Sequence, residues 1–187
     1  KVMYWGTGAW APAQIAEAVT VADRLGAHRP KAEQPWYNML VRHIEGHSGQ
    51  SREKPPDYHV GPSVLDTCAR FGIGVTVFWP LAQGLLAGKY TDGMRSDDRP
   101  VRKSMMAGLL TEDNLAKARL LAGVASDCDL EMAQLALAWV LRRSEISSVV
   151  VGATRMAHIV SNIRASGVRL SDDVLEAVDR ILNGSAV

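Results

Sequence analysis

The sequence has little cysteine, little net charge and no long hydrophobic run, and each shortage excludes a class of protein. Its 187 residues contain two cysteines, Cys68 and Cys128, whose spacing fits no metal or redox motif, so both are expected to be reduced thiols. The formal net charge is +1, which indicates neither nucleic acid nor a lipid surface as a partner. No apolar run is long enough to span a membrane, and the first ten residues lack the pattern of a signal peptide. These absences favour a soluble cytoplasmic protein.

What is present is typical of one globular domain. Hydrophobic residues make up 47% of the chain and charged residues 22%, which is enough apolar surface for a sizeable core. We therefore expect a single domain over residues 1–187. Two stretches, 41–62 and 91–111, are expected to be surface loops, and 171–187 is expected to be a C-terminal helix and tail with Ser171 as the N-cap.

Short extended segments alternate with helical patterns along the chain. Buried strands are expected at 2–6, 30–34, 73–79 and 147–153, and helices at 12–25, 64–71, 112–125, 130–143, 156–164 and 171–182. The strong strands are continuously apolar, as parallel strands are when both of their faces are buried. A strand–helix order repeated four times predicts an α/β fold with parallel strands and helical crossovers. The pattern alone fits either a small open sheet or half of an eight-stranded barrel.

One histidine pair has the spacing of a metal site. His43 and His47 are four residues apart, and Asp57 and His59 follow in the same loop. Two histidines at this spacing bind zinc when they share a helix face, but Gly46 and the surrounding Ser and Gly residues disfavour a helix. We interpret the pair as part of a solvated loop and expect no metal.

Five motifs occur in the order and spacing of the aldo-keto reductase superfamily. They are "YWGTGAW", "AEQPWYNML", "WPLAQGLLAGKY", "MAQLALAWVLR" and "SSVVVGATRMAHIVSNI". The chain most resembles the branch that includes voltage-gated potassium channel β-subunits and related bacterial reductases. The resemblance implies four βα units that correspond to strands five to eight of a (β/α)8 barrel, so the chain would be a half-barrel.

The resemblance also implies a site for NADP(H) at the carboxyl ends of the strands. Gln34 would bind the nicotinamide carboxamide, Phe78 would stack under the nicotinamide ring, and the segment from Pro80 to Gln83 would pass the pyrophosphate. The candidate cofactor-binding residues are Gln34, Phe78, Trp79, Pro80, Leu81, Gln83, Lys89, Arg99, Gly152, Thr154, His158, Ser161 and Asn162. Backbone N–H groups at the helix after "GATR" suit a phosphate whatever side chains surround them.

Several positions depart from the family pattern. Gly8 and Ala9 stand where the family has a serine followed by asparagine or arginine, and Trp79 stands where it has serine. His158 and Ser161 replace the usual Arg or Gln and Glu. The family's catalytic Asp, Tyr, Lys and His lie on the first four strands, which have no counterpart in these residues.

Two main hypotheses remain open, beside a third in which His43, His47, His59 or Asp57 of the long loop supply new acid–base chemistry. The chain would be the NADP(H)-binding half of a carbonyl reductase, inactive alone and completed by an N-terminal half that is missing from these residues, cleaved off or on another chain. Alternatively, it would be a non-catalytic scaffold or partner-binding protein with a degenerate cofactor site. An open half-barrel has two unpaired edges and an uncovered apolar face, so it would self-associate into an oligomer that completes a barrel.

Overall fold

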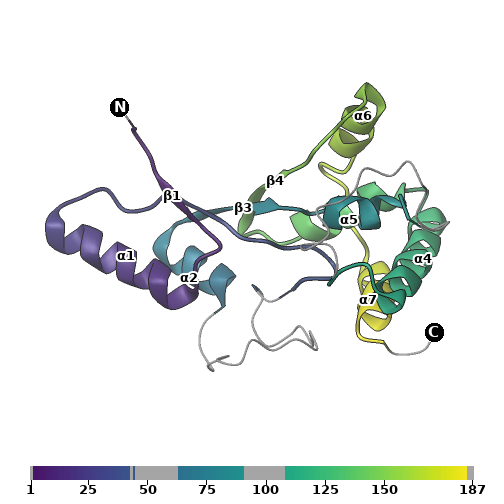
Figure 1. Ribbon diagram of the computed structural model, residues 1–187, viewed down its shortest axis with the longest axis horizontal. Coiled ribbons are helices and arrows are strands. Elements are labelled where there is room, and N and C mark those ends of the chain that lie inside the picture. Colours follow the sequence, from purple (N-terminus) through teal and green to yellow (C-terminus); the bar gives the residue numbers. More distant parts are fainter. Residues whose placement is uncertain (1, 43, 45–62, 91–107, 185–187) are drawn as a thin grey trace.

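Four parallel strands form one sheet in the order in which they occur along the chain. The structure is a computed structural model that describes residues 2–42, 44, 63–90 and 108–184. The strands are β1 (Gly6–Gly8), β2 (Ala32–Gln34), β3 (Gly74–Phe78) and β4 (Ile146–Val150), in the order β1-β2-β3-β4 (Figure 1). All three pairings are parallel. This arrangement confirms the expected α/β class and is that of a half-barrel.

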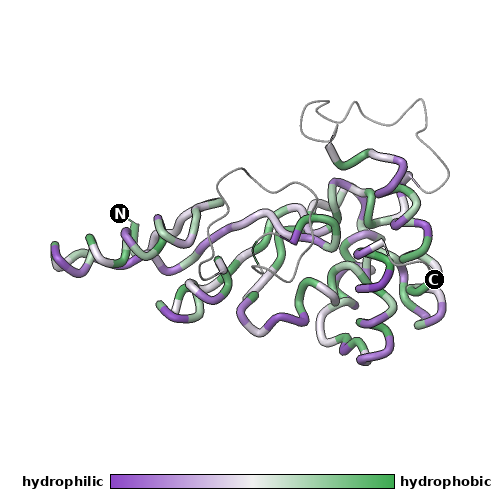
Figure 2. The backbone as a smooth tube through the Cα atoms, turned by 90° about the horizontal axis from the view of Figure 1, so that it is seen from below, coloured by the Kyte–Doolittle hydropathy of each residue, from purple (hydrophilic) through white to green (hydrophobic). Residues whose placement is uncertain are grey.

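Helices connect the strands and cover one face of the sheet. They are α1 (Pro12–Leu25), α2 (Val64–Phe71), the 3-10 segment η2 (Ala82–Ala87), α4 (Glu112–Asp127), α5 (Met132–Leu141), α6 (Met156–Arg164) and α7 (Asp172–Leu182). Helices α1 and α2 pack together below β1 and β3 in Figure 1, and α4, α5 and α7 group at the opposite end. Figure 2 shows hydrophilic and hydrophobic residues alternating along α1, as expected for a surface helix.

The two faces of the sheet differ in the size of their side chains. Thr7, Glu33, Val75 and Val77 are buried toward the helices. The alternate residues lie on the other face and are exposed or half-buried: Gly6, Gly8, Ala32, Gln34, Gly74, Thr76, Phe78, Ser148 and Val150. Most of these are small or polar. The expected uncovered apolar face is therefore absent from the described strands, and most of the exposed large apolar side chains lie near the two edges instead.

Two strand predictions were wrong in part. The first strand is Gly6–Gly8 rather than 2–6, because Gly6 pairs with Ala32 and the preceding residues 2–5 extend into solvent. The last strand forms as Ile146–Val150, but Ser147, Ser148 and Val150 are exposed. Both errors have one cause: β1 and β4 are edge strands of the described sheet, each with one neighbouring strand. The β3 prediction is confirmed, with its alternate residues fully buried.

Helix α2 follows its sequence signals closely. The Ser63 hydroxyl accepts from the Asp66 N–H at 3.0 Å, and the Ser63 N–H donates to Asp66 Oδ2 at 3.2 Å, which together form a capping box. The helix ends at Gly72 in the left-handed conformation (φ 63°), which glycine adopts without steric cost. By contrast, Ser171 is the N-cap of α7 as expected, yet its side chain makes no capping hydrogen bond.

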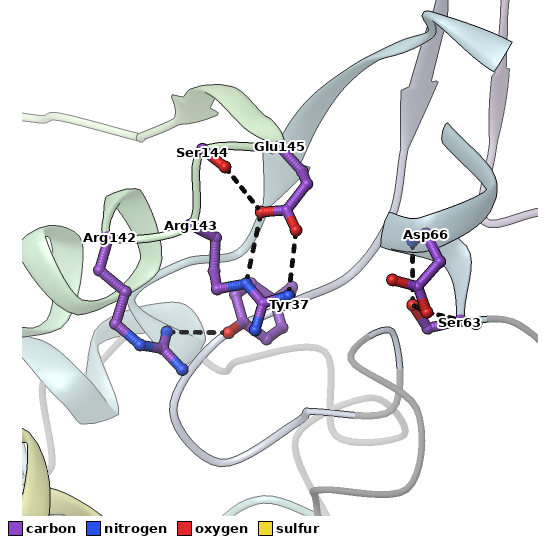
Figure 3. A network of polar contacts seen from close by, with 7 residues as sticks. All are labelled: Tyr37, Ser63, Asp66, Arg142, Arg143, Ser144 and Glu145. Carbon is purple, nitrogen blue, oxygen red and sulfur yellow. Dashed lines mark hydrogen bonds and ion pairs between the residues drawn. The ribbon is translucent and has the colours of Figure 1, made fainter. Parts of the chain in front are cut away.

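Polar contacts connect the loops to the helical layer (Figure 3). Arg142 Nη1 donates to Tyr37 Oη at 3.1 Å and its guanidinium lies 3.7 Å from the centre of the Trp139 ring. Tyr37 stacks on that ring at 5.4 Å. Beside them, Arg143 forms an ion pair with Glu145 at 3.2 Å. Burial alone would raise the pKa of Glu145, but hydrogen bonds and the Arg143 charge outweigh it and lower the pKa.

The described residues at the start of the expected 41–62 loop pack against the body. Ile44 is fully buried, and Arg42 Nη2 donates to Asn183 Oδ1 at 2.8 Å beyond the end of α7. The rest of that loop lies outside the described residues. In the described part of the chain, no helix combines the length and hydrophobicity needed to cross a membrane.

Candidate functional site

The candidate site lies where the four parallel strands end. Gly8, Gln34, Phe78 and Val150 are the last residues of β1, β2, β3 and β4. Parallel strands direct their carboxyl ends to one edge, where ligands of α/β folds generally bind. Most of the residues predicted from the sequence as cofactor ligands lie on these ends or on the segments that follow them.

Three aromatic rings meet at the ends of β2 and β3. The Trp79 ring lies edge-to-face against Trp36 at 5.4 Å and against Phe78 at 5.5 Å. A parallel bridge joins Trp36 to Phe78, and the Phe78 N–H donates to the Pro35 carbonyl at 3.1 Å. Each ring is partly accessible, so the group offers aromatic surface to a planar ligand.

The Trp79 backbone is held in a conformation that bulky residues seldom adopt. Its φ is 54°, in the left-handed region. Asn38, which is fully buried, donates from Nδ2 to the Trp79 carbonyl at 3.0 Å. The Asn38 Oδ1 accepts from the N–H groups of Leu40 and Val41 at 2.9 and 3.0 Å. One amide therefore fixes both the strained residue and the neighbouring turn.

The segment after Trp79 turns sharply. Pro80 is buried, Ala82 and Gln83 have φ values of 45° and 55°, and Gly84 has φ 102°. The Ala82 N–H donates to the Trp79 carbonyl at 3.0 Å and the Gly84 N–H to the Leu81 carbonyl at 2.9 Å. The residues predicted to pass a pyrophosphate thus form one tight, hydrogen-bonded turn.

Lys89 extends back across this turn. A Cβ on Gly84 would lie 3.3 Å from Lys89 Cδ and crowd the lysine stem, and the φ of 102° also favours glycine at this position. The Lys89 ammonium is 5.1 Å from the centre of the Tyr90 ring, a cation–π distance. Tyr90 Oη and Trp36 Nε1 are buried and have no hydrogen-bond partner among the described residues. The segment therefore carries a cation at Lys89 and, at the adjacent Tyr90, a buried hydroxyl with no hydrogen-bond partner among the described residues.

A buried carboxylate holds the end of β1 against β2. Glu33 is fully buried; its Oε2 accepts from the Thr7 hydroxyl and its Oε1 from the Trp10 N–H at 3.1 Å. The Ala9 N–H donates to the Gln34 carbonyl at 3.1 Å. The Gln34 amide is exposed and makes no hydrogen bond in the described part of the molecule. Glu33 therefore positions the turn that stands beside Gln34.

Comparison with known protein families shows which family this chain belongs to. The Aldo/keto reductase family model matches residues 1–183 of the chain. The chain belongs to this family. A probable voltage-gated potassium channel subunit beta from rice is 35% identical over 185 residues, covering 96% of this chain and 52% of that protein. An L-glyceraldehyde 3-phosphate reductase from Escherichia coli O157:H7 is 33% identical, covering 96% of this chain and 49% of that protein. The chain spans about half the length of these curated relatives.

The β4 end of this aldo/keto reductase half is more open than the β3 end. Gly152, Thr154 and His158 are exposed, and Asn162 is half-buried. Arg155 is the N-cap of α6, and its side chain makes no capping hydrogen bond, so side chains leave the first N–H groups of α6 uncapped. The Ser161 hydroxyl donates to Glu131 Oε2 at 2.7 Å, so this side chain connects α6 to α5.

Some predicted residues are not tested by the structure. Arg99 lies outside the described residues, as do His43, His47, Asp57 and His59. Among the residues that are described, no group of three or more His, Cys, Asp and Glu side chains could hold a metal. The other twelve predicted cofactor ligands of this family member are all described.

Sequence reasoning missed Asn38 and Glu33. Both hold backbone beside residues that were predicted to bind the cofactor. The available signal was a buried-strand pattern, "AEQPWYN", that carries an acid and an amide among apolar residues. A charged or amide side chain at such a position needs an internal partner, which is a sign of a structural clamp.

Proposed function

We propose that this chain is the NADP(H)-binding half of a cytoplasmic aldo-keto reductase-like oxidoreductase that acts on a carbonyl substrate. The observation that carries the proposal is the turn after β3. Asn38 holds Trp79 there, and the turn brings Phe78, the Pro80–Gln83 segment and Lys89 to the strand ends beside Gln34. Two free cysteines, one of them buried, support a reducing compartment.

The residues present fit the cofactor at both of its ends. The exposed Gln34 amide can both donate to and accept from a carboxamide, and the half-buried Phe78 ring offers a face for stacking. The uncapped N–H groups at the start of α6 and the accessible Gly152 backbone suit a phosphate. Bound NADPH would supply the hydride for carbonyl reduction.

The chain's own residues bind and orient rather than transfer protons. Gln34, Phe78 and the turn after Trp79 would fix the nicotinamide end, and Lys89 would face the negative charge of the pyrophosphate. The proton donor would come from a second half that carries the family's catalytic residues. We therefore expect no NADPH-dependent aldehyde reduction by the chain alone.

NADPH fluorescence titration of the purified chain tests the proposal. We expect saturable binding that weakens at least tenfold in Lys89→Ala and in Phe78→Ala. Leu120→Ala is the matched control, because Leu120 is an exposed residue on α4 with no place in the site. Absence of saturation at millimolar NADPH, or equal affinity in all four proteins, would overturn the proposal.

A second candidate is a non-catalytic binding protein. It is supported by the exposed apolar side chains at the two edges of the sheet, among them Trp5, Leu25, Met156 and Ile163. Turnover of aldehydes by the chain after addition of a catalytic half would favour the reductase. Partner binding without any NADPH binding would favour the second candidate.

A further inference from the structure

The end of helix α7 carries an asparagine–glycine pair. The chain has four asparagines, Asn38, Asn114, Asn162 and Asn183, and only the last is followed by a glycine, Gly184. The backbone nitrogen after an asparagine can attack the side-chain carbonyl carbon, and glycine hinders this attack least because it has no Cβ. Both residues are exposed, and apart from chain neighbours no described atom lies within 4 Å of the place that a Cβ on Gly184 would take. Water and the attacking nitrogen can therefore both reach the Asn183 amide.

A single backbone hydrogen bond opposes the attack. Asn183 is the C-cap of α7 with ψ 0°, and its N–H donates to the Asp179 carbonyl at 2.9 Å. The Gly184 N–H donates to the Ile181 carbonyl at 3.2 Å. Attack requires rotation about the Asn183 Cα–C bond, which breaks the Gly184 hydrogen bond and leaves the Asn183 N–H in the helix. The reactive geometry can therefore form without unfolding α7.

Arg42 holds the side chain that is attacked. Its Nη2 donates to Asn183 Oδ1 at 2.8 Å, and its Nη1 lies 3.7 Å from Asp179 Oδ1. The Arg42 side chain is only 9% exposed. A cationic donor on the amide oxygen stabilises the negative charge that collects there during attack. One guanidinium thus contacts two residues that are a helical turn apart and activates the amide of one of them.

We propose that Asn183 is a site of spontaneous deamidation, and that Arg42 pairs with the aspartate that forms. The Gly184 nitrogen bonds to Asn183 Cγ and gives up its proton, while the Cγ–Nδ2 bond breaks and ammonia leaves with that proton. The succinimide ring then takes up one water and opens at either carbonyl, which gives aspartate or isoaspartate. Water is the only co-reactant, nothing is oxidised or reduced, and the new acid ionises to add one negative charge.

The neighbouring charges decide which product the fold accepts. A carboxylate at position 183 stands at the negative end of the α7 dipole and one turn from Asp179, and both disfavour it. The buried Arg42 guanidinium offsets them, because it contacts both positions and exchanges a neutral acceptor for a charged one. Isoaspartate instead routes the backbone through the side-chain methylene and moves the carboxylate away. The folded protein should therefore favour aspartate. The inference goes beyond the proposed function, since it requires no cofactor and no second half.

Mass spectrometry of the full 187-residue chain tests the inference. Fresh protein is incubated for weeks at pH 8 and 37 °C, folded or in guanidinium chloride, then digested, and chromatography separates the aspartate and isoaspartate peptides. In the folded protein, Asn183 should react at least tenfold faster than Asn162, which isoleucine follows, and should give more aspartate than isoaspartate. In guanidinium chloride, isoaspartate should predominate. Gly184→Ala should slow the reaction at least tenfold in both conditions, so the slowing does not depend on the fold.

Asn183→Asp separates the role of Arg42 from the reactivity of the asparagine. It should raise the urea midpoint of the wild type and lower that of Arg42→Gln, where the carboxylate faces Asp179 and the helix dipole alone. Far-ultraviolet circular dichroism shows whether each variant is folded.

Three outcomes would overturn the inference. They are an Asn183 that stays intact in the folded protein while it reacts in guanidinium chloride, equal proportions of isoaspartate in the two conditions, and a midpoint shift no more favourable with Arg42 than without it. NADPH binding does not enter these measurements, so failure here leaves the cofactor proposal to its own titration.

Discussion

Helices α2 and α6 are nearly equal in length, eight and nine residues, and each follows a strand of the same sheet, yet they are stabilised very differently. Helix α2 has a side-chain capping box, a left-handed glycine at its end and four buried residues. Helix α6 has no side-chain cap and no buried residue. The centre of the half-barrel is thus complete within the chain, whereas its edge depends on contacts from outside.

The same contrast divides the candidate cofactor site. The proposed nicotinamide end, around β2 and β3, rests on buried polar clamps. The proposed adenosine end, around β4 and α6, consists of exposed and half-buried residues. We therefore expect substitutions at the centre to affect stability and binding together, and substitutions at the edge to affect binding alone.

Asn38→Ala should have the largest effect. It removes three hydrogen bonds, to Trp79, Leu40 and Val41, from a fully buried side chain. At about 1 kcal/mol each, the free energy of unfolding should fall by about 3 kcal/mol, measured by urea denaturation. Asn162→Ala on α6, the matched amide at the edge, should change it by less than about 0.5 kcal/mol. Equal losses would remove the distinction between centre and edge.

Cys68, on the buried side of α2, should be slow to react. Burial, assisted by the charge of Glu33, raises the pKa of its thiol from 9.0 to about 11. Two pKa units leave about a hundredfold less Cys68 thiolate at pH 8, so iodoacetamide should label Cys68 at least about a hundredfold more slowly in the native protein than in the urea-unfolded protein, followed by mass spectrometry.

The same shift has a consequence at high pH. Because the folded pKa lies above the unfolded one, the stability contributed by the Cys68 thiol is complete below pH 9 and is lost as the pH rises from 9 toward 11. Cys68→Ser should remove this alkaline loss. Equal labelling rates of Cys68 in the native and the unfolded protein would contradict the burial of α2 against the sheet.

The central region was also the part most predictable from sequence. The start of α2 after Ser63 and its end at Gly72 follow local rules, and the apolar β-branched run of β3 marks a strand covered on both sides. The edge could not be predicted in this way. The valines of β4 have the composition of a buried strand, and only the neighbouring strands of the complete sheet decide whether they are covered.

The candidate site was predictable to the level of positions, not of conformation. The order of motifs placed Gln34 and Phe78 at the ends of β2 and β3, where they lie, and Lys89 on the segment that follows β3. The left-handed backbone of Trp79 has no local signal, because a bulky residue rarely adopts it. It exists because Asn38, 41 residues away in the chain, binds its carbonyl. Such a clamp depends on tertiary packing.

Glu33→Ala should cost about 2 kcal/mol of unfolding free energy, because it removes the acceptors for the Thr7 hydroxyl and the Trp10 N–H. Glu33→Gln should recover most of this. The new amide oxygen can accept from Trp10, and the amide nitrogen can donate to the Thr7 oxygen, since a hydroxyl serves in either role. Valine at position 7 has no hydroxyl to accept from the new amide. In the double variant Thr7→Val, Glu33→Gln, the glutamine should therefore no longer recover the lost unfolding free energy. Urea denaturation of the wild type and these variants shows whether β1 is held by the hydrogen bonds of residue 33 or by the negative charge of Glu33.

Ser63→Ala should have the smallest effect that can be measured reliably. It removes the N-cap of α2 and should lower the free energy of unfolding by about 1 kcal/mol. Ser171→Ala is the matched control, because Ser171 is an N-cap without a side-chain hydrogen bond, and its loss should be nearly neutral. The two variants thus compare an N-cap serine whose side chain makes a capping hydrogen bond with one whose side chain makes none.

The capping box also predicts how this difference changes with pH. The hydroxyl of Ser63, followed by its backbone N–H, lowers the pKa of Asp66 below its usual 3.8. A folded pKa below the unfolded value means that this contribution is present above about pH 4 and is lost as the pH falls through the folded pKa. The stability difference between wild type and Ser63→Ala should therefore narrow below about pH 4, while Ser171→Ala should follow wild type throughout. A difference that stays constant from pH 6 to pH 3 would show that the Asp66 carboxylate contributes nothing to the cap, and that α2 is held by its buried face alone.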